Sequence, residues 1–210
     1  MKNFDISLYL VTDQGLSKGR TLEYIVEEAV KGGVTMVQLR EKDISSREFY
    51  ELAKSLMFIL KPLSIPLIIN DRLDIALAVN ADGLHIGQGD LPYSIARKIM
   101  GKDKIIGLSV ETIEQARDAN SMDVDYIGLS PVFSTNTKLD INTPLGLSGV
   151  QEIAGFTKHK TVAIGGINSS NAESVIASGA DGIAVVSAIV SHENSKEAAA
   201  ILRSMIKKAK

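Results

Sequence analysis

The hydrophobic residues of the chain gather into eight short runs that recur along its 210 residues. The runs are rich in Val, Ile and Leu, which is typical of strands that a parallel sheet buries on both faces. They cover residues 8–11, 36–39, 66–70, 82–87, 105–110, 125–130, 161–166 and 182–190. The pattern therefore predicts eight strands.

The stretches between these runs have the spacing of amphipathic helices. Two of them place apolar residues on one helix face, namely Leu22, Ile25, Val26, Ala29 and Val30, and then Phe49, Leu52, Ala53, Leu56 and Met57. The segment 195–210 reads as a closing helix with Lys and Arg near its end, where the helix dipole favours cations. Helices are thus expected to alternate with the strands.

Short polar motifs mark the expected helix ends. Thr112, with Gln115 three positions later, resembles a capping box that opens a helix. Ser170 is expected to cap the start of the seventh helix, and Gly179 is expected to end it in the left-handed conformation.

Eight strand–helix units leave about 26 residues for each unit, just enough for a parallel crossover. Right-handed crossovers repeated in this way close into a (β/α)8 TIM barrel, so we expect residues 1–210 to form a single α/β domain. An open doubly wound sheet is the competing fold. Its G-x-G-x-x-G turn after the first strand is not matched by TDQGLSKGR, which favours the barrel.

Composition narrows the class of partner. Charged residues make up 23% of the chain and its formal net charge is −2, so no basic field points to nucleic acid or an anionic membrane. The absence of cysteine excludes disulfides, thiolate metal ligands and a cysteine nucleophile. No signal peptide is recognisable and nowhere do about 18 apolar residues run together. We expect a soluble, cytoplasmic protein with small-molecule partners, and its oligomeric state stays open.

The second run leads into QLREK, residues 38–42. Because side chains alternate along a strand, Gln38, Arg40 and Lys42 share one face. Burying two cations together is costly without an anionic partner. The strand end therefore indicates an anion site, with Arg40 and Lys42 simply solvated as the alternative.

Carboxylates follow the next two runs. Asn70 and Asp71 end the third run, and Asp90 follows the fourth. Two carboxylates from adjacent strand ends suit Mg2+, which takes one or two of them together with phosphates and water. A helix cap at Asp71 and a turn at Asp90 are the alternatives. Zinc is less suitable because no two of the three histidines lie close in sequence.

Two further polar residues lie on the fourth and fifth runs. If Leu84 and Ile86 face the outer helices, then His85 points into the barrel, as a core residue or as part of a site. Ser109 lies near the end of the fifth run. Its hydroxyl could serve a site or bond to its own backbone.

The longest irregular stretch, residues 133–146, follows the sixth run. Barrel active sites lie on this rim, so we expect a lid that covers the substrate. The stretch supplies Thr135, Thr137 and Lys138, which suit phosphate or carboxylate contacts, although TNTK also reads as an ordinary polar loop.

A second anion site is expected after the last two strands. Gly165 and Gly166 end the seventh run, and the eighth reaches Val186 and Ser187. Glycines let the backbone approach a phosphate, and barrels often bind one there, although a plain turn is the alternative. Two anion sites across one rim suggest an enzyme that joins two phosphorylated molecules.

Seven motifs in this order resemble the thiamine phosphate synthase (thiamine-phosphate pyrophosphorylase) family: QLREK, INDR, DGLHIGQGD, GLS, DYIGLSPVFSTNTK with PLGL, AIGGI and GADGIAVVSAI. The resemblance implies a Mg2+-dependent transferase. Such an enzyme joins 4-amino-2-methyl-5-(diphosphooxymethyl)pyrimidine to a thiazole (carboxythiazole) phosphate and releases pyrophosphate. Ser130 and Ser134 depart from the family pattern, which usually has glycine and often proline at these positions.

The resemblance also implies roles for individual residues. Arg40, Lys42, Ser109 and Lys138 would be catalytic, and Asp71 and Asp90 would bind Mg2+. The implied substrate-binding residues are Gln38, Leu39, Arg40, Glu41, Lys42, Asn70, His85, Ser109, Thr135, Asn136, Thr137, Lys138, Gly166, Val186 and Ser187.

Three other functions suit the same fold. A thiazole tautomerase has no reason to keep QLREK, Asp71, Asp90 and Lys138 together. A binder without catalysis would hold thiazole phosphate and release no pyrophosphate. A phosphosugar epimerase would more naturally have a catalytic carboxylate pair or a Schiff-base lysine.

Overall fold

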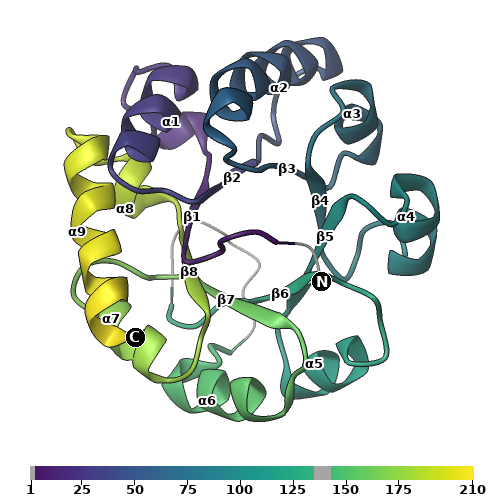
Figure 1. The fold of residues 1–210 in the computed structure, drawn as a ribbon, viewed down its shortest axis with the longest axis vertical. Coiled ribbons are helices and arrows are strands. Elements are labelled where there is room, and N and C mark those ends of the chain that lie inside the picture. The colour runs from purple at the N-terminus through teal and green to yellow at the C-terminus, as the bar shows by residue number, and fades with distance from the viewer. Residues whose placement is uncertain (1–2, 135–142) are drawn as a thin grey trace.

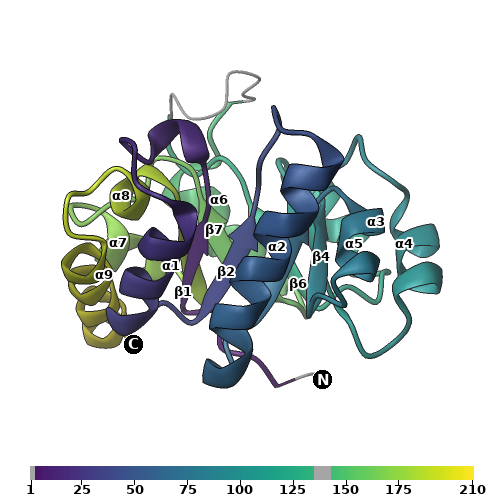
Figure 2. The same ribbon diagram turned by 90° about the horizontal axis from the view of Figure 1, so that it is seen from above.

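The computed structural model describes residues 3–134 and 143–210, and it contains a closed barrel of eight parallel strands. Neighbouring strands pair in chain order, and β8 pairs back with β1. Helices form a ring around the barrel in Figure 1, and Figure 2 shows them running alongside the strands. The predicted (β/α)8 barrel is confirmed.

The barrel strands are short, and a helix follows each of them. The strands are β1 (Leu8–Val11), β2 (Met36–Leu39), β3 (Leu67–Asn70), β4 (Gly83–Ile86), β5 (Ile105–Val110), β6 (Tyr126–Leu129), β7 (Lys160–Ile164) and β8 (Gly182–Val185). The helices are α1 (Leu22–Lys31), α2 (Ser46–Leu60), α3 (Leu73–Ala78), α4 (Tyr93–Met100), α5 (Ile113–Ala119), α6 (Gly146–Phe156), α7 (Ala172–Ala177), α8 (Ser187–Val190) and α9 (Ser195–Ala209), with 3-10 turns η1 (Gln14–Leu16) and η2 (Lys61–Leu63). None of these helices, in the part of the chain that is described, is long and apolar enough to cross a membrane.

Each predicted strand overlaps an observed one, but the last run was assigned wrongly at its end. The strand β8 ends at Val185, and Ser187–Val190 forms the short helix α8. Ile189 and Val190 are buried there, so this helix hides its apolar residues as a strand would. An apolar run of this length does not distinguish the two conformations by periodicity.

The expected helix ends were partly right. The Thr112 hydroxyl accepts from the Gln115 N–H at 3.2 Å, but the Gln115 side chain accepts from the Glu111 N–H, one residue before the cap. Gly179 follows α7 with a φ of 100°, which confirms the left-handed end. The prediction that Ser170 caps the start of α7 was wrong.

The residue that precedes α7 is Asn171. The Ser170 hydroxyl donates instead to the Asn168 side chain, at 2.7 Å. Ser170 and Asn168 therefore belong to a hydrogen-bonded loop between β7 and α7. A polar sequence such as INSSN offers several candidate caps, and local sequence does not choose between them.

Two apolar layers result from the alternation of side chains along the strands. Outward residues such as Leu8 and Leu10 pack against the helices. The inner cluster consists of Phe4, Ile6, Tyr9, Val11, Met36, Ile68, Ile105, Tyr126, Val162 and Ala184. Its members lie mostly toward the amino ends of the strands, whereas polar residues such as Gln38 and Asn70 come one step later on the inward face. The barrel thus has an apolar base below a polar upper layer.

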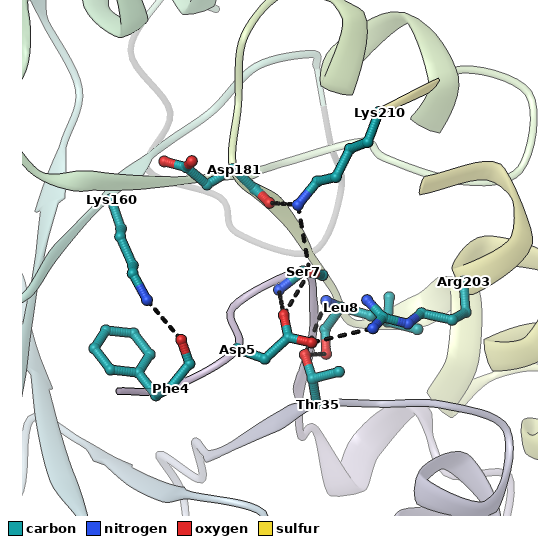
Figure 3. A network of polar contacts seen from close by, with 9 residues as sticks. All are labelled: Phe4, Asp5, Ser7, Leu8, Thr35, Lys160, Asp181, Arg203 and Lys210. Carbon is teal, nitrogen blue, oxygen red and sulfur yellow. Dashed lines mark hydrogen bonds and ion pairs between the residues drawn. The ribbon is translucent and has the colours of Figure 1, made fainter. Parts of the chain in front are cut away.

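The amino-terminal end of the barrel is covered by residues 4–7, which cross it in Figure 1. Lys160 donates to the Phe4 carbonyl at 2.6 Å, and its ammonium lies 4.2 Å from the centre of the Phe4 ring. Arg203 donates to Asp5 at 3.1 Å, and Figure 3 shows both basic side chains reaching toward the segment. These contacts hold the segment against the base of the barrel.

Gly107 leaves the space that the Tyr126 ring occupies, because a Cβ added at Gly107 would lie 2.0 Å from that ring. We expect Gly107→Ala to lower the free energy of unfolding by about 1–3 kcal/mol, as overpacking of a core does. Urea denaturation of the variant measures this change.

Gly155→Ala is the matched control, since Gly155 lies in α6 with nothing within 4 Å of an added Cβ. It should leave stability unchanged or raise it by up to about 1 kcal/mol, because alanine favours helix. Equal unfolding free energies for the two variants would contradict the packing argument.

Candidate active site

A cavity of about 570 Å³ opens at the carboxyl end of the barrel. Inward residues of the strands form its floor, and the loops that follow the strands form its walls. Eleven of the predicted site residues line it: Gln38, Arg40, Lys42, Asn70, Asp71, His85, Asp90, Ser109, Gly166, Val186 and Ser187. The predictions for Thr135, Asn136, Thr137 and Lys138 lie outside the described residues.

The end of β2 carries the basic side of the cavity, through Arg40 and Lys42. The Arg40 N–H donates to the Thr12 hydroxyl at 3.0 Å, and the Thr12 N–H donates to the Gln38 carbonyl at 2.9 Å. The loop after β1 therefore fixes the backbone at the point where the basic side chains leave the strand.

Two predicted residues of QLREK have side chains outside the cavity lining. Leu39 is fully buried in the layer between barrel and helices. Glu41 accepts from the Thr12 hydroxyl at 2.9 Å and from the Gln14 N–H at 3.2 Å, and burial raises its pKa. The Glu41 carboxylate thus holds the loop after β1 in place, and a substrate contact of either residue would have to use its backbone.

Asp71 and Asp90 bring two carboxyl groups together after β3 and β4. Burial raises the pKa of Asp71 to about 6, helped by a hydrogen bond with Asp90 and by its negative charge, while Lys42 and Arg40 act in the opposite direction. The Asp71 backbone has a φ of 60°, and its N–H donates to the His85 carbonyl at 2.9 Å. The fold therefore holds a carboxyl pair at an energetic cost.

This carboxyl pair fits Mg2+, because a divalent cation would offset the burial and the neighbouring negative charge that raise the pKa of Asp71. Within residues 3–134 and 143–210, no group of three or more His, Cys, Asp or Glu could hold a metal. Two carboxylates completed by phosphate oxygens and water are what Mg2+ prefers. Asp90 also accepts from the Gly87 N–H at 2.6 Å, so this residue stabilises a turn and lines the cavity at the same time.

His85 points into the barrel, as predicted, and lies on the cavity floor. Its Nδ1 lies 2.8 Å from the Tyr126 hydroxyl and its Nε2 lies 2.9 Å from the Ser109 hydroxyl. Burial lowers the pKa of His85 to about 4, so the imidazole is neutral near pH 7. The residue is both a satisfied core histidine and part of the cavity.

Sequence reasoning missed Tyr9 and Tyr126, which connect Gln38 to His85. Gln38 donates to the Tyr9 hydroxyl at 2.9 Å, and the two tyrosine hydroxyls lie 2.9 Å apart. A signal was available, because Tyr126 alternates with Ile127 and so shares the inward face with Gly128. Nothing in the sequence alone, however, joins β1 to β6 across the barrel.

Gly165 and Gly166 form the opposite wall, with φ values of 105° and 65°. A Cβ added at Gly166 would lie 2.8 Å from the Ser134 carbonyl oxygen, so the backbone approaches the loop after β6 too closely for another residue. The Gly166 carbonyl accepts from the Asn171 amide at 3.0 Å and from the Asn168 amide at 3.4 Å. This peptide is thereby held in one orientation beside the cavity.

Comparison with known proteins gives one family. The sequence model described as "Thiamine monophosphate synthase" matches residues 8–189. The chain is 56% identical over 190 residues to a thiamine-phosphate synthase of Syntrophomonas wolfei, covering 90% of this chain and 91% of the relative. It is 50% identical over 192 residues to one of Clostridium novyi, covering 91% and 94%.

A solved structure agrees with these relatives. The thiamine phosphate pyrophosphorylase from Pyrococcus furiosus superposes with a TM-score of 0.89 and is 37% identical in sequence. The superposition covers 98% of this chain and 97% of that one. The similarity therefore extends over the whole barrel.

The raised pKa of Asp71 predicts a gain in stability when its charge is removed. A carboxyl whose pKa rises from 3.8 to about 6 on folding loses its stabilising contribution as the pH rises through this interval. With a chelator present, Asp71→Asn should therefore be more stable than the parent chain at pH 7.5. We expect about 1 kcal/mol, since the group is only half-buried, and a smaller gain at pH 4.5.

Asp74→Asn serves as the control for this experiment. A hydrogen bond to Arg72 lowers the pKa of Asp74, so removing its charge should give no gain at pH 7.5. Thermal unfolding of both variants at the two pH values decides the matter. A parent chain as stable as Asp71→Asn at pH 7.5 would show that the carboxyl pair carries no such cost.

Proposed function

The chain belongs to the thiamine monophosphate synthase family, and we propose that its cavity joins a pyrimidine methyl diphosphate to a thiazole phosphate. Its activity is thiamine-phosphate synthesis, which makes it a transferase. One observation carries the proposal: basic and acidic groups after β2, β3 and β4 face glycine backbone after β7 across a single cavity. A diphosphate suits the first side, and a monophosphate suits the second.

The diphosphate side is assigned to Gln38, Arg40, Lys42, Asn70 and Ser109. Arg40 and Lys42 bring positive charge to the end of β2, where the leaving pyrophosphate would gain negative charge. Asp71 and Asp90 are the proposed Mg2+ ligands, and Mg2+ bound there supplies further neutralisation of the phosphate oxygens. Lys138, outside the described residues, is proposed for the same task by family resemblance.

The monophosphate side is assigned to Gly166, Val186 and Ser187. The close approach of Gly166 to the loop after β6 leaves its wall as bare backbone, which suits N–H donation to phosphate oxygens. Thr135, Asn136 and Thr137 are proposed to complete this side, as the family resemblance implies. The two substrates would then meet above His85.

The proposed reaction is a substitution at the methylene carbon of the pyrimidine substrate. The carbon–oxygen bond breaks and its electron pair leaves with pyrophosphate, while the thiazole nitrogen gives the pair that forms the new carbon–nitrogen bond. The aminopyrimidine ring delocalises the positive charge on the methylene carbon, so no protein nucleophile is needed. The chain contributes charge, positioning and exclusion of water.

We also propose that residues 1–210 act as one catalytic domain in the cytoplasm. The eight barrel strands span residues 8–185, and the family match spans residues 8–189, so both extend over most of the chain. The proposed partners are small molecules.

The test is release of pyrophosphate from purified protein given both substrates, with and without Mg2+. We expect release to need both substrates and the metal, with one thiamine phosphate formed for each pyrophosphate. Asp71→Asn should need more Mg2+ and turn over at least about tenfold more slowly, since a buried charged contact is lost. Asp74→Asn is the control and should behave as the parent chain.

Folded protein that binds thiazole phosphate without releasing pyrophosphate would reject the proposed reaction. The tautomerase and the non-catalytic binder would then be tested by following the thiazole alone. Full activity of Asp71→Asn at an unchanged Mg2+ requirement would reject only the metal role of Asp71.

Because the two substrates are assigned to different sides of the cavity, a variant on each side should weaken the binding of a different substrate. Arg40→Ala should raise the KM for the pyrimidine diphosphate about tenfold or more, because a charge-assisted contact is lost, and leave thiazole phosphate binding nearly unchanged. Gly166→Ala should do the reverse, since its Cβ would meet the Ser134 carbonyl at 2.8 Å. Steady-state kinetics with each substrate varied in turn measures both effects, and a loss confined to the same substrate in both variants would contradict the division.

A further inference from the structure

A chain of hydrogen bonds crosses the barrel beneath the cavity. It runs from the Gln38 amide to the Tyr9 hydroxyl at 2.9 Å, then to the Tyr126 hydroxyl at 2.9 Å. It continues to His85 Nδ1 at 2.8 Å, and from His85 Nε2 to the Ser109 hydroxyl at 2.9 Å. The five groups come from five different strands, so the chain links β2 to β5 through the interior.

The number of protons allows this chain only two consistent directions. Each hydroxyl has one proton to donate, and a neutral imidazole carries a proton on one nitrogen and a lone pair on the other. If Tyr126 donates to His85 Nδ1, then Nε2–H donates to Ser109. If Nδ1–H donates to Tyr126 instead, then Ser109 must donate its own proton to Nε2.

Gln38 selects the first direction, because it presents its amide nitrogen to Tyr9. That nitrogen only donates, so the Tyr9 proton is directed to Tyr126 and the Tyr126 proton to His85 Nδ1. Nε2 then carries the imidazole proton and donates it to Ser109. The Ser109 hydroxyl proton is left free to point into the cavity that this residue lines.

The Tyr126 ring, and with it the hydroxyl oxygen, is fixed in place by its surroundings. The His85 ring stacks on the Tyr126 ring with centroids 5.5 Å apart, while the rings of Tyr9 and Phe4 meet it edge-on at 5.9 and 6.2 Å. Gly107 leaves the room that the ring fills. Packing of the ring therefore keeps the hydroxyl oxygen between Tyr9 and His85, so the direction of its proton is set by these two hydrogen-bond partners.

We propose that Tyr126, supported by Tyr9, is a positioning residue that holds His85 as the Nε2–H tautomer and thereby makes Ser109 a hydrogen-bond donor. A phosphate oxygen only accepts hydrogen bonds, so a serine locked as a donor suits an anion, and one locked as an acceptor would repel it. The inference rests on the proposed function in one respect, namely that the group facing Ser109 is a diphosphate.

The first measurement needs no substrate. Nitrogen NMR of protein labelled in its histidines distinguishes a protonated ring nitrogen from an unprotonated one. In the parent chain we expect the proton of His85 on Nε2. A combined His159→Gln and His192→Gln background identifies the His85 signals, because these are the other two histidines of the sequence. A proton on Nδ1 in the parent chain would overturn the proposal.

Tyr126→Phe removes the hydroxyl and keeps the ring. We expect the Nε2–H preference to be lost, the KM for the pyrimidine diphosphate to rise about tenfold, and thiazole phosphate binding to change less than about twofold. Tyr9→Phe leaves Tyr126 able to donate and should give a smaller effect of the same kind. Tyr24→Phe is the control, because Tyr24 is an exposed residue of α1, and it should change neither reading.

An unchanged tautomer in Tyr126→Phe would overturn the positioning role even if activity fell, since a fall alone could come from packing. An unchanged KM together with a changed tautomer would overturn the link to the substrate. If the parent chain released no pyrophosphate, the proposed function would fail, while the NMR result would still decide the direction of the hydrogen-bond chain.

Discussion

A polar group inside a closed barrel must find its hydrogen-bond partner there, because bulk water does not reach it. The inner face of this barrel satisfies that constraint in two steps. Toward the amino ends of the strands, Met36, Ile68 and Val162 are apolar side chains that need no hydrogen-bond partner. Above them, the polar side chains of Gln38 and His85 can be buried because Tyr9 and Tyr126 form hydrogen bonds with them. The cavity floor is therefore neutral, while the charged groups stay at the rim.

The rim of the cavity, in contrast to its floor, holds charged side chains close together. Burial and the nearby Asp90 raise the pKa of Asp71, although two cations at the end of β2 partly compensate. A fold selected for stability alone would not keep such a pair, and residues that break the local rules in this way are expected at functional sites. The neutral floor thus fixes the geometry of the cavity, and the charged rim provides its charge.

Much of the fold and part of the candidate site could be predicted from the sequence, because they depend on local patterns of residues. Apolar runs gave the strands, and the meeting of parallel strand ends at one rim brought Arg40, Asp71 and Asp90 together. The same reasoning failed for residues 187–190, because a short apolar run suits helix and strand alike. It also failed for Ser170, where neighbouring polar residues compete for the cap, and for Tyr126, whose partners lie on other strands. The lid expected over residues 133–146 includes residues 135–142, which lie outside the described residues.

The segment that covers the amino-terminal end of the barrel has a consequence for synthesis on the ribosome. Asp5 binds Arg203, and Ser7 lies 3.4 Å from the Lys210 ammonium, while β1 pairs with β8. Asp5 therefore leaves the exit tunnel 198 residues before its partner Arg203. Until then β1 has an unpaired edge and the base of the barrel is open to water. During synthesis this edge of β1 stays exposed to pairing with other chains until β8 has been made.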